Sequence, residues 1–94
     1  MKVAVVTGMA RTAGIGHAIC TTLLDAGMAV IGLDQVPLEP SSPLHQRAHF
    51  CSKLASVCNV EPVDQIAQAL QELQQTEISV LVNNAGITDR KSVV

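Results

Sequence analysis

The chain has 94 residues and a net charge of −2, and 48% of its residues are hydrophobic against 15% that are charged. This length accommodates one domain, and the composition is too apolar for a disordered chain. A small negative charge without a basic block excludes the electrostatic footprint of a nucleic-acid or anionic-membrane partner. The 3 cysteines are odd in number and lack CxxC spacing, so we expect a reduced, soluble, cytoplasmic chain.

The first part of the sequence predicts a strand–helix–strand unit. A continuous apolar run at Lys2–Thr7 predicts a strand buried on both faces, and the run is too short for a signal peptide or a membrane span. Met28–Leu33 predicts a second strand that ends at Asp34, and we expect the two strands to be parallel. Between them, a helix over 15–26 is predicted to end at Gly27. Its apolar stripe is predicted to comprise Ile15, Ala18, Ile19, Thr22, Leu23 and Ala26.

The second part of the sequence predicts another such unit after an irregular connection. Residues 35–47 hold three of the 4 prolines, which predicts a surface connection without a regular helix. A third strand is predicted within Ala48–Cys58 and a fourth at Ile78–Val82. The helix between them begins at Glu61–Pro62, where a proline in the first turn is tolerated. Its apolar stripe is predicted to comprise Val63, Ile66, Ala67, Leu70 and Leu73.

This order of elements predicts an α/β fold: half of a doubly wound Rossmann fold, with a parallel sheet of about four strands in the order 3-2-1-4 and crossover helices. We expect residues 1–94 to form one partial domain that stops soon after the fourth strand. That strand would lie at an edge of the sheet, and such an edge invites pairing with a second copy or a complementary chain. The apolar residues expected to be uncovered there are Ile78, Val80, Leu81 and Val82.

The turn after the first strand predicts a dinucleotide site. Glycines at positions 8, 14 and 16 let the chain turn sharply and approach a pyrophosphate, and the N–H groups at the helix start attract negative charge. By itself, this pattern is equally well explained as a plain strand–helix junction. Asp34 favours the functional interpretation, since a carboxylate about 20 residues further on accepts the ribose hydroxyls and repels a 2′-phosphate. NAD is therefore preferred, although Arg11, unless it is simply solvated, could meet a phosphate and make NADP possible.

These features resemble the short-chain dehydrogenase/reductase family. The segment Thr7–Gly16 is similar to its TGxxxGIG turn, Asp34 to its acid on the second strand, and Asn59-Val60 to its adenine clasp. Asn83–Gly86 is its NNAG motif unaltered, and the following Ile-Thr looks like the 3-oxoacyl-carrier-protein reductase branch. One departure is the loop length, since five residues, Met9 to Ala13, stand where the pattern has three. A longer loop can carry its N–H groups away from the phosphate.

The resemblance implies an NAD(P)-dependent oxidoreductase that transfers a hydride between the nicotinamide and a carbonyl or alcohol substrate. Asn83 is expected to tie the loop to the sheet. The implied cofactor-binding residues are Gly8, Arg11, Gly14, Ile15 and Gly16 at the pyrophosphate and adenosine ribose, Asp34 at the ribose hydroxyls, Asn59 and Val60 at the adenine, and Asn84, Ala85 and Gly86 at the end of the fourth strand.

The catalytic residues of the family find no counterpart. It uses a Ser, a Tyr, a Lys and a helix Asn, whereas this chain has 0 Tyr, and Lys91-Ser92 has the wrong order and spacing. We therefore predict that the chain alone is catalytically incompetent. The alternatives are a non-catalytic nucleotide-binding or self-associating module, or a non-functional gene remnant.

Four other candidate residues receive structural interpretations. His17 is expected to face solvent, and Cys20 is expected to pack inside the first helix. His45 and His49 have a spacing that suits a metal on a helix, but they lie in or beside the proline-rich connection without a third ligand. We therefore expect no metal site.

Overall fold

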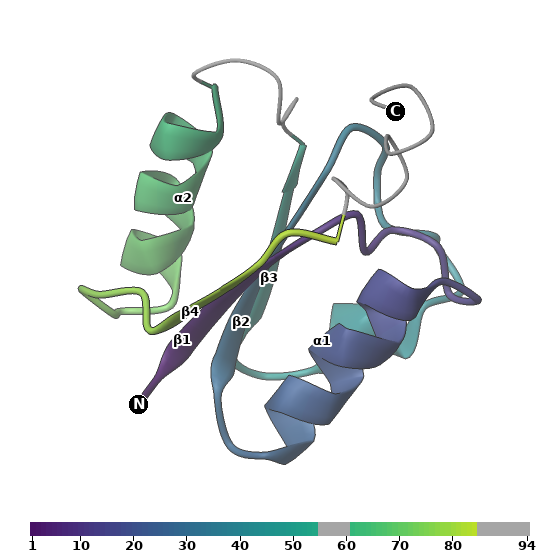
Figure 1. Ribbon diagram of the computed structural model, residues 1–94, viewed down its shortest axis with the longest axis horizontal. Helices are drawn as coiled ribbons and strands as arrows, with labels where there is room; N and C mark the ends of the chain where they lie inside the picture. The colour runs from purple at the N-terminus through teal and green to yellow at the C-terminus, as the bar shows by residue number, and fades with distance from the viewer. Residues whose placement is uncertain (55–60, 85–94) are drawn as a thin grey trace, which may run out of the picture.

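The computed structural model describes residues 1–54 and 61–84, which build a parallel sheet with α1 and α2 on opposite faces (Figure 1). The four strands lie in the order β3-β2-β1-β4, which confirms the predicted fold class. The strands are β1 (Val3–Thr7), β2 (Ala29–Asp34), β3 (Phe50–Leu54) and β4 (Val80–Val82), the helices are α1 (Ile15–Asp25) and α2 (Glu61–Glu72), and a short 3-10 helix, η1, spans Pro43–Gln46.

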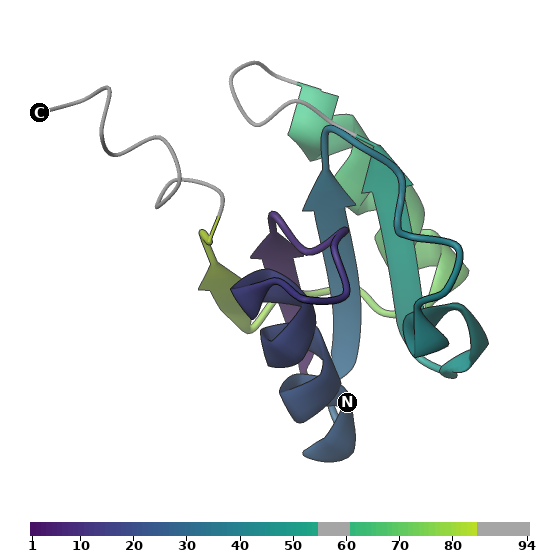
Figure 2. The same ribbon diagram turned by 90° about the vertical axis from the view of Figure 1, so that its right-hand side faces the viewer.

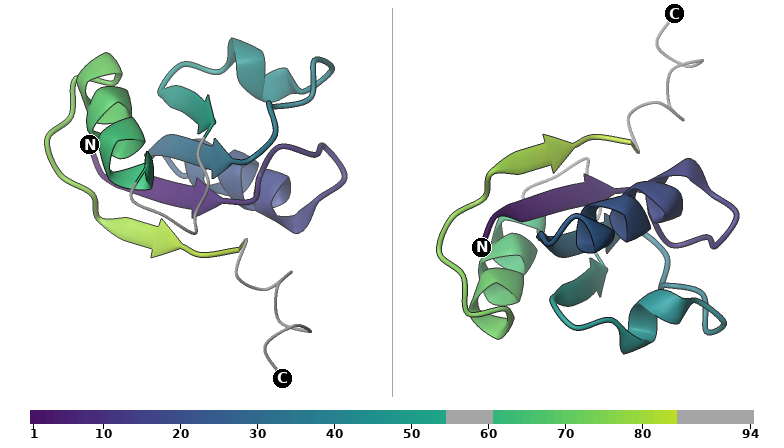
Figure 3. Two further views of the ribbon diagram at one scale, coloured as in Figure 1. Left: turned by 90° about the horizontal axis from the view of Figure 1, so that it is seen from above. Right: turned by 90° about the horizontal axis from the view of Figure 1, so that it is seen from below.

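The two central strands are buried on both faces, as their unbroken apolar sequences predict. β1 and β2 run in parallel register from the pair Val3–Ala29 to the pair Thr7–Leu33. β4 pairs with β1 through three residues, and β3 pairs with β2 through five. Views from above and below show β4 at one edge of the sheet and β3 at the other (Figure 3).

One face of the sheet packs against α2. Because side chains alternate along a strand, the odd-numbered residues of β1 and β2 point to this face. The predicted stripe of α2 is corrected at one of its described positions: Ala67 is exposed, and Ala69 is fully buried instead. The side chain of Val63, also predicted for this stripe, lies outside the described ones. The spacing from Ile66 to Leu73 then follows a regular helical face. The residues in this layer are Val3, Val5, Ala29, Ile31, Leu33 and Ala69, with Cys51, Ile66, Leu70 and Leu73 packed against them.

The other face packs against α1, and here the predicted helix stripe is confirmed at Ile19 and Leu23 but wrong at its other positions. The exposed positions of that predicted stripe are Ile15, Ala18, Thr22 and Ala26. Ile15 is 71% exposed, and the buried positions of the helix are Gly16, His17, Cys20 and Leu24, with Ile19 and Leu23 at the flank. The physical reason lies at Gly16, whose missing Cβ lets the helix approach the turn after β1 and so sets its rotation. The predicted end of the helix is confirmed, because Gly27 has φ +90° and its N–H donates to the carbonyl of Leu24.

The connection after β2 is also more than the surface segment that its prolines predict. Leu38, Ser42 and Leu44 are buried. The two leucines belong to the buried cluster between the sheet and α1, here called the α1-side cluster, whose members are Val6, Met9, Cys20, Leu24, Val30, Leu38 and Leu44. The prolines exclude a long helix but leave the chain free to dock side chains beside α1. η1 accordingly lies on the α1 side of the sheet, and Figure 2 shows it at the β3 end of that face.

The structure also describes two of the cysteines and the helices that bear on a membrane span. Cys20 is fully buried as predicted, and burial raises the pKa of its thiol to about 12. Cys20 and Cys51 are both free thiols. Within the described ranges, none of the helices has the length and apolar character needed to cross a membrane.

Gly32 on β2 faces the side chain of Met9, and we predict that Gly32→Ala lowers the free energy of unfolding by about 1–3 kcal/mol. An added Cβ would lie 2.8 Å from Met9 Cγ and 2.9 Å from Met9 Sδ. Because the obstructing atoms belong to one flexible side chain, Gly32→Ala should cost less in a Met9→Ala background. Urea unfolding of the two single variants and the double variant measures this coupling. Equal costs in both backgrounds would contradict the contact.

Candidate functional site

The candidate site lies at the carboxyl ends of the parallel strands. The loop from Gly8 to Gly14 leaves β1 there, beside the ends of β2 and β4 (Figure 1). In the order β3-β2-β1-β4 the crossover direction changes between β1 and β4. Open α/β sheets bind ligands outside the strand ends at such a switch point.

Two of the predicted glycines are required by the backbone at this point. Gly8 has φ +72°, which L side chains rarely adopt, and its N–H donates to the carbonyl of Leu33 at 2.8 Å. A Cβ on Gly16 would lie 2.2 Å from the carbonyl oxygen of Gly8. This close approach places the start of α1 directly against the turn that leaves β1.

The start of α1 has the features of an anion site. Gly14 is its N-cap residue, and no side chain in the described part of the chain caps the helix there. Its first turn also lacks an acidic residue, so the N–H groups of this turn meet no carboxylate from the helix itself. Arg11 and Ile15 are exposed on either side of Gly14. An anionic group such as a pyrophosphate therefore fits this end of α1.

The two additional residues of the loop do not leave it loose. Met9 and Ala10 are each 1% exposed. The N–H of Ala10 donates to Asp34 Oδ2 at 3.0 Å, and the N–H of Thr12 donates to Glu39 Oε1 at 2.5 Å. Two carboxylates, one at the end of β2 and one in the connection after it, thus hold the loop, and its exposed tip comprises residues 11–13.

Asp34 is part of this arrangement rather than a plain solvated acid. It is half-buried at the end of β2, and its Oδ1 accepts the N–H groups of Gln35 at 2.7 Å and Val36 at 3.4 Å. With Ala10 on Oδ2, the carboxylate accepts three hydrogen bonds. An ionised carboxylate offers about four acceptor positions, so capacity remains for a ligand hydroxyl.

The end of β4 is tied to the same turn by two asparagines. Asn84 is buried, and its Nδ2 donates to the carbonyl oxygen of Gly8 at 2.9 Å. Thr7 Oγ1 donates to Asn83 Oδ1 at 3.2 Å, which agrees with the structural role expected for Asn83. The contact to Gly8 gives Asn84 a structural role as well.

Four of the predicted cofactor-binding residues, Asn59, Val60, Ala85 and Gly86, lie outside the described residues. The other seven, at positions 8, 11, 14, 15, 16, 34 and 84, come together around the loop and the start of α1. Sequence reasoning missed Glu39, whose contact with Thr12 depends on the fold of the connection.

The prediction for His17 is wrong. It is 6% exposed, and its Nε2 lies 2.6 Å from Ser42 Oγ, which itself accepts the N–H of Leu44. The connection covers His17 because Leu38 and Leu44 draw that segment onto α1. Across residues 1–54 and 61–84, no cluster of three or more His, Cys, Asp or Glu side chains could hold a metal ion.

A small hollow lies beyond the end of β2, beside the turn that Asp34 holds. Its volume of about 170 Å³ is below the range of roughly 300–1,000 Å³ that is usual for a ligand pocket. The residues around it are Met9, Val36, Pro37, Leu38, His45, Ser52, Lys53 and Leu54.

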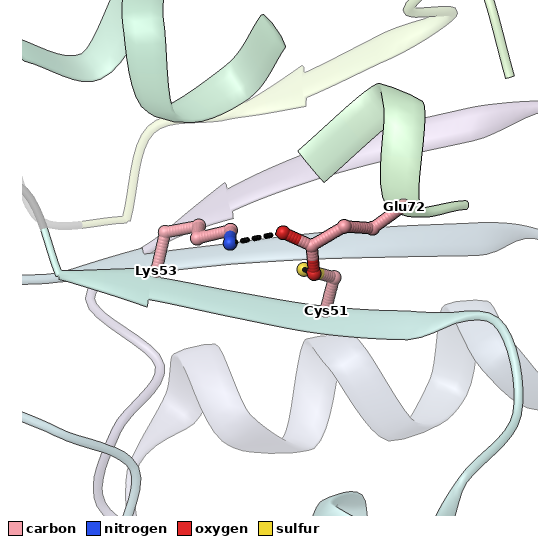
Figure 4. Close-up of polar contacts among 3 residues, drawn as sticks. All are labelled: Cys51, Lys53 and Glu72. Atoms are coloured by element: carbon pink, nitrogen blue, oxygen red, sulfur yellow. Dashed lines mark hydrogen bonds and ion pairs between the residues drawn. The ribbon is translucent and has the colours of Figure 1, made fainter. Parts of the chain in front are cut away.

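A second polar cluster lies away from the loop, between β3 and α2 (Figure 4). Glu72 accepts a hydrogen bond from the thiol of Cys51 at 3.3 Å and forms an ion pair with Lys53. Burial and the Glu72 carboxylate raise the pKa of Cys51 to about 11, so the thiol stays protonated. The cluster fastens the last turn of α2 to the edge strand.

This cluster predicts an acid-sensitive contribution to stability. The hydrogen bonds from Lys53 and Cys51 lower the pKa of Glu72 from its usual value of 4.5. The ionised carboxylate therefore adds to the stability of the fold at pH values above 4.5, and this stabilisation is lost as the pH falls through the lowered pKa. Glu72→Gln should therefore destabilise the chain near neutral pH and remove part of the acid-induced loss. Urea unfolding at neutral pH and well below 4.5 tests this, with the exposed Glu77→Gln as the control. If the free energies of unfolding of wild type and Glu72→Gln differed by the same amount at both pH values, the assignment would be contradicted.

Comparison with known proteins gives a family match over nearly the whole chain. A family model described as short chain dehydrogenase matches residues 2–94. Farnesol dehydrogenase from Aedes aegypti is 40% identical over 91 residues, which cover 92% of this chain and 36% of that protein. An uncharacterized oxidoreductase from Schizosaccharomyces pombe is 34% identical over 96 residues, covering 99% of this chain and 36% of that protein. The chain thus spans about a third of the length of these relatives.

Proposed function

The chain belongs to the short-chain dehydrogenase family, and from this premise we propose that its 94 residues form the NAD-binding part of an NAD(P)-dependent oxidoreductase. The observation that carries the proposal is the position of Asp34. Its carboxylate holds the N–H of Ala10 at the glycine loop and keeps capacity for a further donor. A ribose hydroxyl is such a donor, and the same negative charge repels a 2′-phosphate.

The residues of the loop divide the binding of a dinucleotide between them. The N–H groups in the first turn of α1, beside Gly14, would hold the pyrophosphate, and Asp34 would hold the adenosine ribose. Gly16 allows the helix start to approach the end of β1. When bound, NAD supplies the nicotinamide that exchanges a hydride with the substrate.

Proton transfer and substrate selection fall outside these residues in this proposal. The chain contains 0 Tyr, so the tyrosine that serves the family as general acid and base is not among its residues. We expect the chain alone to bind cofactor without turnover. One relative is named for farnesol, which makes alcohols the first substrate class to assay in a longer protein carrying this segment. The resemblance to 3-oxoacyl-carrier-protein reductases keeps 3-oxoacyl thioesters as the second class.

Calorimetric titration of the chain with NAD and NADP, combined with thermal melts, tests the proposal. A ligand that binds the folded state raises the melting temperature as its concentration passes the dissociation constant. We expect saturable binding with NAD preferred. A chain that melts cooperatively but binds neither dinucleotide would overturn the proposal and leave a resemblance of fold alone.

A second candidate function, self-association, is favoured by the surface around β4. β4 pairs with β1 on one side and forms an edge of the described sheet. Ile78, Val80 and Leu81 are 41%, 39% and 66% exposed. Val82, also expected to be uncovered, is instead half-buried against the core on the α1 side of the sheet. We propose that this edge pairs with a second copy or with a complementary chain.

Sedimentation velocity over a range of concentrations tests this second candidate. A dimer that becomes monomeric in Leu81→Lys, but not in Thr22→Lys on the exposed side of α1, is the expected result. A monomer at all concentrations would argue against pairing between copies. A chain that neither binds a dinucleotide nor associates with a partner fits the remaining alternative, a gene remnant without function.

A further inference from the structure

Glu39 occupies a fixed position beside the glycine loop. Its carboxylate accepts the N–H of Thr12 at 2.5 Å, and its own N–H donates to the carbonyl of Ala10 at 2.9 Å. Its carbonyl oxygen accepts the N–H of Ser42 at 3.0 Å and lies 2.9 Å from His45 Nε2. The residue is therefore fixed through its backbone as well as through its side chain.

The core holds the segment that carries Glu39. Leu38, directly before it, and Leu44, in η1, are 7% and 2% exposed within the α1-side cluster. The contact between Ser42 and His17, at 2.6 Å, fastens the same segment to α1. Because buried contacts fix the backbone, the carboxylate is not a freely moving surface acid.

Glu39 and Asp34 act on the same short stretch of the loop. Asp34 accepts the N–H of Ala10. The backbone N–H of Glu39 donates to the carbonyl of Ala10, and the Glu39 carboxylate accepts the N–H of Thr12. The bond from Thr12, with smaller effects of Arg11 and His17, keeps the pKa of Glu39 below its usual range, so the group is ionised near neutral pH. Two negative charges thus border the loop, and Glu39 partly offsets the charge of Arg11.

We propose that Glu39 is a second specificity-determining residue, which acts with Asp34 to reject the 2′-phosphate of NADP. This inference rests on the proposed binding of a dinucleotide at the loop. A 2′-phosphate on a ribose held by Asp34 would enter the field of both carboxylates, whereas the hydroxyl of NAD adds no charge there. Glu39 also partly offsets the positive charge of Arg11, which would otherwise attract a phosphate.

Glu39→Gln is the direct test, because glutamine keeps an oxygen for the N–H of Thr12 and removes the charge. Dissociation constants for NAD and NADP are measured by calorimetry, after melting has shown that the variant folds. We expect NADP to bind about tenfold more tightly, a change of about 1.4 kcal/mol, while the constant for NAD changes little. Glu77→Gln, an exposed acid remote from the loop in sequence, is the matched control and should change neither.

The other outcomes separate this inference from the proposed function. An unchanged ratio of the two dissociation constants in Glu39→Gln overturns the inference. Equally tighter binding of both cofactors also overturns it, because the carboxylate would then compete with the pyrophosphate for the N–H of Thr12. An equal weakening for both also overturns it, because Glu39 would then only position the loop. Wild-type chain that binds neither cofactor would overturn the proposed function instead.

Arg11→Gln is a second variant at the exposed loop tip that leaves the bond from Thr12 to Glu39 in place. Removing this cation leaves the negative charge of Glu39 without its partial offset, so discrimination against NADP should increase. An unchanged ratio of the two dissociation constants would overturn the proposed role of charge even if Glu39→Gln fails to fold.

Discussion

Replacing Gly16 with alanine is expected to abolish cooperative unfolding or to lower the free energy of unfolding by about 3 kcal/mol or more. The new Cβ would lie 2.2 Å from the carbonyl oxygen of Gly8 and 2.8 Å from Asn84 Nδ2. The first obstruction is backbone in the turn that leaves the buried strand β1, so it cannot move aside as a side chain can. A chain of this length has a total stability of roughly 5–14 kcal/mol, so the loss is a large fraction of it.

Gly14→Ala is the matched control for this prediction. Gly14 has φ −87°, and its Cβ would lie 3.2 Å from the carbonyl oxygen of Arg11, which is tight but not a severe overlap. Thermal and urea unfolding of both variants compares the two positions directly. If Gly16→Ala were no less stable than Gly14→Ala, the close approach of α1 to the turn would be wrong.

Replacing Asp34 with alanine is expected to weaken NAD binding by at least about tenfold and to remove the preference for NAD over NADP. Hydrogen bonds to a charged group contribute about 1.5–3 kcal/mol, and the carboxylate also supplies the repulsion of a 2′-phosphate. The variant also releases the N–H of Ala10, which loosens the loop. Calorimetric titration with both dinucleotides measures the affinity and the preference together.

Two further variants separate these effects of Asp34. Asp34→Asn keeps one oxygen acceptor, so it should retain more of the loop structure while losing the discrimination against NADP. Asp64→Ala removes an exposed acid from α2, which packs on the face of the sheet opposite α1. This variant should leave the affinities for NAD and NADP unchanged. A preference for NAD that survives in Asp34→Ala would show that another group sets it.

The strands and the glycine turn could be predicted because their causes are local in the sequence. A strand buried on both faces needs an uninterrupted apolar run, as at Val3–Thr7, and a sharp exit from it needs a residue that tolerates positive φ, as at Gly8. The end of α1 at Gly27 follows the same logic. The sheet order then followed from the alternation of strands and helices.

The errors concern features that depend on tertiary contacts. The buried face of α1 is set by the approach of Gly16 to Gly8, which no periodicity within the helix reveals. The prolines of the connection correctly excluded a long helix, but they carry no information about where Leu38 and Leu44 dock. The burial of His17 and the contact from Glu39 to Thr12 follow from that docking, so the sequence alone could not predict them.

The most direct test of the account is to map the amides that respond to NAD in an isotope-labelled chain by nuclear magnetic resonance. We predict saturable shifts concentrated in the loop from Gly8 to Gly16 and in the turn from Asp34 to Glu39, all with one dissociation constant. Residues at the opposite end of the sheet, such as Lys2 and Met28, should change little. Shifts that do not saturate, or that centre on the β4 edge rather than the loop, would contradict the placement of the dinucleotide site.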